Sequence, residues 1–443
     1  MEVVMRKKRR GLSLGSILTL CLTAAVIAGC VFMFGRIRGG AEGGMDAQRV
    51  IGAVHSFMES AGGGNPEPQV NVRTVTVTLA PVTSPPATPA PVTAAPVSNP
   101  YQPFSFTLTA GGLLAFQSDL SDSVYNKAEK TLNYESVVQP IRAKIYSDIN
   151  LVTLPQTINT TDRKYSDTLA PGEAAIALQA MGFDQVALAT EHILDQGAKG
   201  LEDTVSSLNS RQLGCAGVSS NGDASRTRLV QVNGGTVAIL SYTDVLTSKS
   251  KNELGRSNSF FTFYDEGLAR ADIQSARNQG ARCVIVCMYW GKQDAASVTN
   301  AQRTTAQALA EMGADVILGT RPSRVLPMEL IYCSGPDGKN HTAFVAYSLG
   351  TLLTESREAF DICGLLLHMS VRSDEQGVTH FEALEYTPTY IWRQSVGGQM
   401  QYRLICSADP APEGMSTQQK EVMQRSLNRI QTVLKNSPVI ERK

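Results

Sequence analysis

Short apolar runs alternate with amphipathic segments along the chain from Phe104 onward. Apolar runs of about four to eight residues are typical of strands, and apolar residues at every third and fourth position are typical of helices. This alternation predicts an α/β domain. The predicted strands are Phe104–Ala110, Ile149–Leu154, Gln185–Ala189, Thr236–Tyr242, Cys283–Tyr289, Val316–Gly319, Ala343–Ser348 and Leu365–Val371.

Helices are predicted between these strands, and each is followed by a glycine that can stop it. In α/β sheets, the loops at the carboxyl ends of strands collect binding and catalytic groups, so polar residues that follow the strands are candidate functional residues. The predicted helices are Gly172–Met181, Lys199–Arg211, Glu266–Asn278 and Ala301–Met312, and an amphipathic stretch at Thr417–Leu434 predicts another helix in a C-terminal extension, 406–443.

The N-terminus combines a basic cluster, Arg6–Arg10, with an uncharged apolar stretch from Gly11 to Phe34. About 20 apolar residues suffice to cross the hydrocarbon core of a bilayer as a helix. Residues 1–38 are therefore predicted to form a transmembrane signal anchor, with the basic cluster in the cytoplasm. The remainder of the chain would then be extracytoplasmic, on a single-pass protein of the cell membrane.

Two alternatives remain for this segment. Ile27–Cys30 resembles a lipoprotein cleavage box in which Cys30 would be lipidated, and a cleaved signal would release a secreted form. The apolar run continues past Cys30 to Phe34, which favours the uncleaved anchor.

Residues 39–103 change character, with glycine-rich pieces followed by sequence rich in proline, threonine, alanine and valine. Proline disfavours helices and sheet ladders and favours the extended polyproline II conformation. This segment is predicted to be a disordered stalk that holds the domain away from the membrane.

The composition of the 443-residue chain is that of a globular protein without excess charge. Hydrophobic residues make up 42% and charged residues 18%, and the formal net charge is zero, so we expect no nucleic acid partner. The eight cysteines show no paired spacing. Cys283 and Cys287 lie about 13 Å apart along one face of a predicted strand, which favours buried small residues over a disulfide or metal site.

One segment carries a specific motif: residues Val186–Gly197 read VALATEHILDQG, with Gly200-Leu201 and Thr204 after them. In order and spacing, this segment resembles the signature of the CapA-type family of poly-gamma-glutamate capsule synthesis. The resemblance covers Phe104 to about Ser370 and implies that residues 104–405 form a CapA-like domain with a calcineurin-like metallophosphatase fold. Such a fold is a two-sheet sandwich flanked by helices, with the motif residues around a metal site. Further segments that follow the family's order are Thr109–Leu114, Asp148–Pro155, Tyr289–Gly291, Gly319–Ser323 and Tyr347–Thr351.

The chain departs from the family at most positions that would hold metal. A divalent metal pair needs carboxylates, imidazoles and amide oxygens, and here two carboxylates and three imidazoles of the motifs are replaced. His192 is the sole motif imidazole retained, so we expect no metal and no cofactor. The replaced motifs are Gly111-Gly112 for Gly-Asp, Thr153-Leu154-Pro155 for Asn-Leu-Glu, Thr190-Glu191-His192 for Asn-Asn-His, Tyr289-Trp290-Gly291 for His-Trp-Gly, Gly319-Thr320-Arg321-Pro322-Ser323 for Gly-x-His-Pro-His, and Gly350-Thr351 for Gly-Asn.

Arg321 is the most informative of these substitutions, because a guanidinium cannot ligate a metal and stays charged at any working pH. Glu191 stands where the family has a neutral amide. We therefore predict that Arg321 pairs with Glu191 and supplies the positive charge of the missing metal; the alternative is that both side chains point to solvent.

The candidate site residues follow from these motifs. His192 is the candidate catalytic residue, although a lone histidine facing Asp195 is also typical of a hydrogen-bonded loop. Trp290 is a candidate for stacking on a ligand or, alternatively, for core packing. The candidate ligand-binding residues are Glu191, Tyr289, Trp290, Lys292, Arg321 and Arg324, and we predict that Gly112, Thr153, Glu191, His192, Tyr289, Arg321 and Ser323 converge on one cleft.

Three functions compete on this basis. The leading hypothesis is a catalytically inactive domain that binds an acidic envelope polymer or the capsule machinery. The second is an active hydrolase with a rebuilt site that uses Glu191, His192 and carboxylates such as Asp119, Asp122 or Asp162. The third is a scaffold for cell-wall or capsule machinery.

Overall fold

The computed structural model of this chain describes residues 103–161, 164–219, 226–254, 263–358 and 362–442. The predicted anchor, Cys30 and all but the last residue of the predicted stalk lie outside the described residues. Within the described ranges, no helix is both long enough and apolar enough to cross a membrane.

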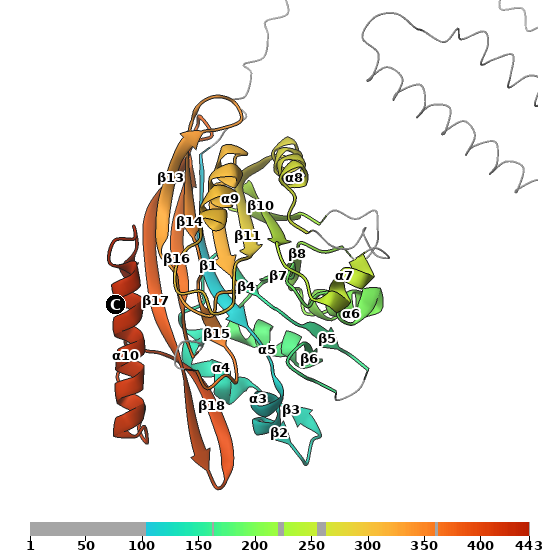
Figure 1. The fold of residues 1–443 in the computed structure, drawn as a ribbon, viewed down its shortest axis with the longest axis vertical. Helices are drawn as coiled ribbons and strands as arrows, with labels where there is room; N and C mark the ends of the chain where they lie inside the picture. The colour runs from blue at the N-terminus through green and yellow to red at the C-terminus, as the bar shows by residue number, and fades with distance from the viewer. Residues whose placement is uncertain (1–102, 162–163, 220–225, 255–262, 359–361, 443) are drawn as a thin grey trace, which may run out of the picture. The chain divides into compact units, whose positions relative to one another are not determined.

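A mixed nine-stranded sheet forms one layer (Figure 1). Its β1, β4, β7 and β8 strands are parallel, whereas β16, β17 and β18 add antiparallel strands on the other side of β1. Two short strands, β15 and β19, pair in parallel with β1 and β17. In spatial order the main strands are β18 (Gln399–Cys406), β17 (Thr379–Val396), β16 (Cys363–Ser373), β1 (Phe104–Leu114), β4 (Ile149–Thr153), β7 (Gln185–Ala187) and β8 (Gly214–Ala216), with β15 (Thr351–Leu353) and β19 (Ile440–Glu441) beside them.

A six-stranded sheet forms the second layer. Its central strands run parallel, and β9 and β13 close the two edges as antiparallel hairpin partners. In spatial order the strands are β13 (Met328–Ser334), β14 (Asn340–Ala346), β12 (Val316–Thr320), β11 (Ala281–Tyr289), β10 (Gly235–Thr243) and β9 (Arg228–Val232). Two small ladders complete the strands: β2 (Tyr125–Asn126) with β3 (Thr131–Leu132), and β5 (Thr157–Asn159) with β6 (Leu169–Pro171).

Both faces of the central strands are buried, which explains their continuous apolar sequences. In β11, Cys283, Ile285 and Cys287 share a core with the first sheet. The alternate residues Val284 and Val286 pack with α8 (Glu266–Asn278) and α9 (Asn300–Glu311). The outer face of the first sheet packs against α4 (Glu135–Arg142), α5 (Ala174–Met181) and α6 (Gly197–Asn209). The described residues thus form the two-sheet α/β sandwich flanked by helices that the sequence predicted.

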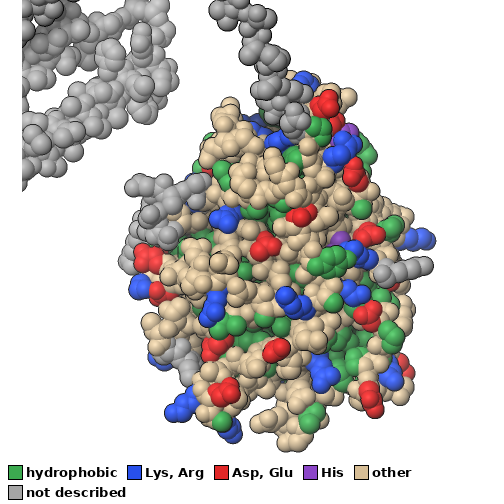
Figure 2. Space-filling view, turned by 180° about the vertical axis from the view of Figure 1, so that it is seen from behind, with side chains coloured by type: hydrophobic (Ala, Val, Ile, Leu, Met, Phe, Trp, Pro, Cys, Tyr) green, Lys and Arg blue, Asp and Glu red, His purple; other side chains and the backbone are tan. Residues whose placement is uncertain are grey.

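The C-terminal extension packs on this sandwich. Its helix α10 (Thr417–Leu434) has the predicted bounds and packs on β17 and β16, while β19 extends the first sheet. Ile430 and Leu434 of α10 belong to the hydrophobic core that residues of both sheets form. Basic and acidic side chains are interspersed on the face that Figure 2 shows, consistent with the zero net charge.

The strand register sets which residues meet at the carboxyl ends of the strands. Thr243 of β10 lies opposite Tyr289 of β11, which in turn lies opposite Thr320 of β12. The residues that directly follow these three strands therefore lie beside one another at the same edge of the sheet. In the first sheet, β7 ends at Ala187, shortly before the Glu191 turn.

Candidate functional site

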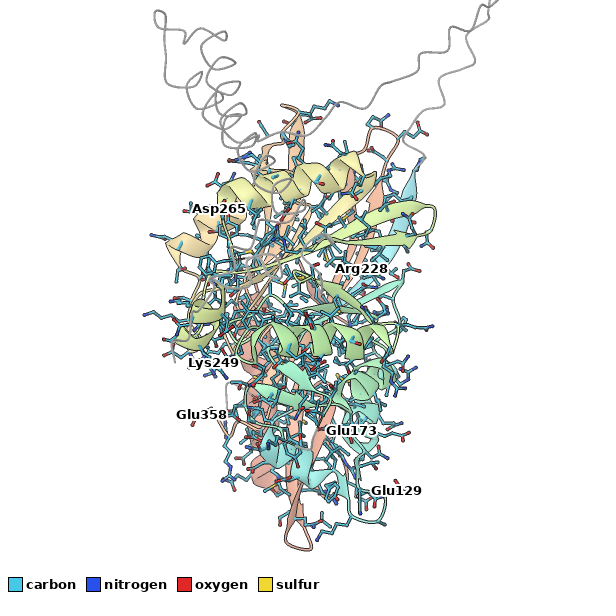
Figure 3. The ribbon with its side chains drawn as sticks, turned by 90° about the vertical axis from the view of Figure 1, so that its right-hand side faces the viewer. Glu129, Glu173, Arg228, Lys249, Asp265 and Glu358 are labelled. Carbon is cyan, nitrogen blue, oxygen red and sulfur yellow. The ribbon has the colours of Figure 1, made fainter. Side chains whose placement is uncertain are left out.

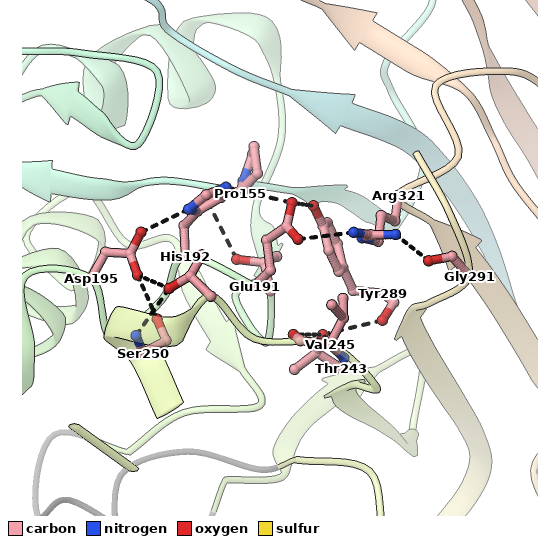
Figure 4. A network of polar contacts seen from close by, with 12 residues as sticks. Pro155, Glu191, His192, Asp195, Thr243, Val245, Ser250, Tyr289, Gly291 and Arg321 are labelled. Atoms are coloured by element: carbon pink, nitrogen blue, oxygen red, sulfur yellow. Dashed lines mark hydrogen bonds and ion pairs between the residues drawn. The ribbon is translucent and has the colours of Figure 1, made fainter. Parts of the chain in front are cut away.

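Arg321 and Glu191 form an ion pair at these strand ends (Figure 4). Arg321 Nη2 lies 3.1 Å from Glu191 Oε2, and each side chain is only 16% exposed. Arg321 Nη1 donates to the carbonyl of Gly291, and the Tyr289 hydroxyl donates to Glu191 Oε1 at 3.0 Å. The predicted pairing of Arg321 with Glu191 is therefore present.

His192 lies between two carboxylates. Its Nδ1 is 2.7 Å from Asp195 Oδ2, and its Nε2 is 3.4 Å from Glu191 Oε1. Asp195 is in turn held at Oδ1 by the hydroxyls of Thr247 and Ser250, the latter at 2.7 Å. Ser250 belongs to α7 (Ser248–Leu254), the helix that carries Lys249 in Figure 3.

The Asp195 carboxylate holds the imidazole of His192 and the start of α7, and it makes no contact of this kind with the next helix. That helix, α6, begins at Gly197 and not at Lys199, and its N-cap residue Gln196 makes no side-chain capping bond. Gly197 does relieve the backbone there, with φ of 67°.

Glu191, His192, Asp195 and Arg321 form a cluster of ionisable side chains, the Glu191 cluster, whose charges stabilise each other. Burial alone would raise the pKa of Glu191, but its hydrogen bond with His192 and the adjacent Arg321 outweigh burial and lower the pKa to about 2. Burial would likewise lower the pKa of His192, whereas its bonds with Glu191 and Asp195 raise it. Burial opposes ionisation of Asp195 too, but Thr247, His192 and Ser250 lower its pKa. The Arg321 guanidinium and the His192 imidazole thus both favour the ionised forms of the carboxylates that they contact.

Arg321 shows two further irregularities. Its φ is 93°, in a region that non-glycine residues rarely adopt, and such strain tends to persist at functional sites. Its Nε is buried and has no acceptor among the residues that the structure describes.

The remaining predicted site residues lie around this cluster or beneath it. Trp290 is 1% exposed, donates from Nε1 to the Tyr347 carbonyl at 3.0 Å and stacks on that ring, so it packs in the core and not at a rim. Lys292 is exposed and Arg324 half-buried. Tyr289, His192 and Arg321 contact the Glu191 carboxylate.

The other motif segments are connected to one another by close contacts. A Cβ on Gly112 would lie 2.1 Å from the Gly350 carbonyl oxygen, so β1 approaches that turn too closely for any side chain. Thr351 donates to the Ser323 carbonyl at 3.3 Å. Two surface hollows, of about 520 and 590 Å³, lie along α3 (Ser118–Ser123), β2, β3, α4 and α5. No residue of the Glu191 cluster lines either hollow.

The carboxylates suggested for a rebuilt hydrolase site are placed elsewhere. Asp119 and Asp122 belong to α3, where the backbone N–H of Asp119 donates to Glu355 and Asp122 accepts from the hydroxyl of Tyr165. Asp162 lies outside the described residues. The carboxylate that does orient His192 is Asp195.

The donors at this site do not fit a divalent metal pair. Both imidazole nitrogens of His192 face carboxylates, both oxygens of Glu191 are engaged, and a guanidinium lies where the family would supply an imidazole. Across the described ranges, no three His, Cys, Asp or Glu side chains gather as a set that could hold a metal ion.

Comparison with known proteins identifies the family. Residues 107–356, more than half of the chain, match the family model of the bacterial capsule synthesis protein PGA_cap. The chain belongs to this family.

Two curated relatives of this PGA_cap chain are capsule proteins. The PGA biosynthesis protein CapA of Bacillus subtilis is 27% identical over 235 residues, which cover 51% of this chain and 57% of that protein. The capsule biosynthesis protein CapA of Bacillus anthracis is 28% identical over 186 residues, 42% of this chain and 43% of that protein. The chain spans about half the length of the curated relatives it matches.

Solved structures resemble the chain weakly. The NAD nucleotidase of Haemophilus influenzae aligns over 76% of this chain and 64% of its own, with a TM-score of 0.40 and 11% identity. The sulfate thiohydrolase SoxB of Thermus thermophilus aligns over 74% and 61%, with a TM-score of 0.33 and 11% identity. The family assignment rests on the sequence match alone.

Proposed function

We propose that this PGA_cap chain is a membrane-anchored, extracytoplasmic protein of capsule or envelope polymer synthesis. Its domain binds a carboxylate-bearing polymer of the poly-gamma-glutamate type and does not hydrolyse it. The Arg321–Glu191 ion pair carries this proposal, because it puts a fixed organic cation where the family resemblance implies metal ligands.

The names of the relatives support the polymer class. One is described by its role in PGA biosynthesis and the other by its role in capsule biosynthesis. A guanidinium is well suited to a carboxylate polymer, since its planar donors match both carboxylate oxygens. The predicted anchor would place the domain where such a polymer is exported.

The test combines metal analysis with polymer binding on the full-length chain in mild detergent. We expect substoichiometric Mn, Fe and Zn, binding of poly-γ-glutamate, and loss of that binding in Arg321→Met. Arg303→Met is the matched control, because Arg303 is half-exposed and pairs with Glu329 away from the site. Stoichiometric metal together with turnover of phosphoester or γ-glutamyl substrates would refute the proposal. Equal envelope pull-down by wild type and Arg321→Glu would favour a scaffold.

A hydrolase remains the second candidate because of one observation. Asp195 orients His192 through a contact of 2.7 Å, and an oriented imidazole can act as a general acid or base. Hydrolysis of an envelope polymer that is lost in His192→Ala would support this function. Activity that survives His192→Ala combined with Glu191→Ala would eliminate it.

A further inference from the structure

We propose that Arg321, Tyr289 and His192 form a carboxylate-binding site that the Glu191 side chain occupies in this structure, so that a ligand carboxylate binds by displacing Glu191. This inference rests on the proposed function and identifies both its recognition group and an internal competitor. Glu191 is then neither a metal ligand nor a contact to the polymer.

Side chains from three separate segments already converge on one carboxylate. Arg321 Nη2 is 3.1 Å from Oε2, and the Tyr289 hydroxyl is 3.0 Å from Oε1. His192 Nε2 is 3.4 Å from the same Oε1. A cation, a phenol and an imidazole around two oxygens are what an external carboxylate would need.

The tyrosine acts as a donor toward the carboxylate. Burial and the nearby charge of Glu191 raise the pKa of Tyr289 well above its usual value, so the phenol keeps its proton. The site therefore selects an anion over a cation.

Glu191 uses the guanidinium incompletely. It takes the Nη2 donor, while the adjacent Nε is buried without an acceptor among the described residues. The opposite side of the guanidinium is fixed, because Nη1 donates to the Gly291 carbonyl. A carboxylate that enters side-on can accept from Nε and Nη2 together, which is the stronger bidentate mode.

The backbone at Glu191 is held independently of its side chain. The Glu191 carbonyl accepts from the Thr247 N–H at 3.2 Å, which holds the backbone of the turn. His192 is 25% exposed and gives a ligand access on its side of the carboxylate. Asp244 is the other carboxylate near Arg321, and its Oδ2 lies 3.4 Å from the Gly291 N–H.

Chemical rescue provides the first test. Full-length Glu191→Ala is unfolded by denaturant with acetate, with acetamide as the neutral isostere, or with chloride at the same ionic strength. We expect acetate alone to raise the unfolding midpoint, and this effect to vanish in Glu191→Ala combined with Arg321→Met. A midpoint that responds equally to acetate and chloride would overturn the site.

Polymer affinity provides the second test. We expect Glu191→Ala to bind poly-γ-glutamate about tenfold more tightly than wild type, the factor that corresponds to removing one competing charge-assisted hydrogen bond. Glu191→Gln keeps the shape of the side chain without its charge and should also tighten binding, which keeps the test valid if the alanine variant does not fold.

The experiments distinguish a failure of the proposed function from a failure of the Glu191 displacement. If the variants bind the polymer no more tightly than wild type, the displacement is wrong while the proposed function stands. If acetate rescues Glu191→Ala but no form of the chain binds the polymer, the carboxylate site stands and the proposed function is wrong.

Discussion

The Arg321–Glu191 pair predicts a specific pattern of stability changes. Replacing Arg321 by Met removes the guanidinium and leaves Glu191 with only the Tyr289 hydroxyl and His192. Breaking a buried ion pair leaves an uncompensated charge, and with side chains that are 16% exposed we expect a loss of about 3 kcal/mol in the free energy of unfolding. The double variant with Glu191→Gln should recover much of this loss.

The size of the coupling follows from the ionisation of Glu191. A carboxyl whose pKa falls from 4.5 to about 2 has its ionised form stabilised by about 3 kcal/mol. Arg321 shares this stabilisation with His192, and water screens part of it through the exposed sixth of each side chain. We therefore expect a coupling energy of about 1.5–2 kcal/mol between Arg321 and Glu191.

Denaturant unfolding of the four full-length forms at neutral pH measures this coupling. A second cycle on Arg303 and Glu329 is the control: these side chains lie 2.9 Å apart but are 50% and 42% exposed, so their coupling should be about 0–1 kcal/mol. If the Arg321 and Glu191 changes add within about 0.5 kcal/mol, the pair does not interact and the charge-replacement argument is refuted.

Four further predictions concern pH, packing and topology. The pKa of His192 is raised in the folded state, so its contribution to the free energy of unfolding is complete below about pH 6.5 and is lost as the pH rises through the folded pKa. The difference in free energy of unfolding between wild type and His192→Gln should therefore shrink above about pH 6.5. A difference that does not change with pH would contradict this prediction. For Glu191 the sign is reversed, and the gap to Glu191→Gln should shrink as the pH falls from 4.5 toward 2. Gly112→Ala should lose about 1–3 kcal/mol in denaturant unfolding because its Cβ would meet a carbonyl, whereas Gly267→Ala in the first turn of α8, where the nearest atom is a side-chain oxygen at 3.2 Å, should be neutral or stabilising. Protease added to intact cells should release the domain if residues beyond 38 are extracytoplasmic, and full protection of the domain would overturn that orientation.

The sandwich could be predicted from the sequence because its central strands are buried on both faces. The continuous apolar sequences of β11 and β12 predict strands without any knowledge of the tertiary structure. The long strand β17 was missed because its first half is mostly half-exposed and it contains Pro388. Its strand conformation depends on pairing with β16 and β18, which sequence periodicity does not report.

The ion pair of the site was predictable because both of its residues depart from a motif. Glu191 and Arg321 stood out because they carry charge at positions where the family has an amide and an imidazole. The support of His192 was not foreseen beyond Asp195 itself, since Thr247 and Ser250 reach that carboxylate across 52 and 55 residues of sequence. Hydroxyl residues are too common in loops for their spacing to indicate such a contact.

The Glu191 and Arg321 substitutions depend on each other. A glutamate beside His192 and Asp195 would gather a second carboxylate without a metal to balance it, and an arginine alone would bury an unpaired cation. The paired Glu191 and Arg321 side chains have no net charge. In addition, Gly112 lies so close to the Gly350 carbonyl that there is no room at this position for the aspartate that a metal site would need. Replacing Arg321 by His should therefore not create a metal site, because Glu191 and Asp195 would still hold His192 and β1 would still lack a carboxylate at Gly112. Metal analysis of the full-length Arg321→His variant tests this, and stoichiometric zinc or manganese in that variant would show that the ion pair alone excludes the metal.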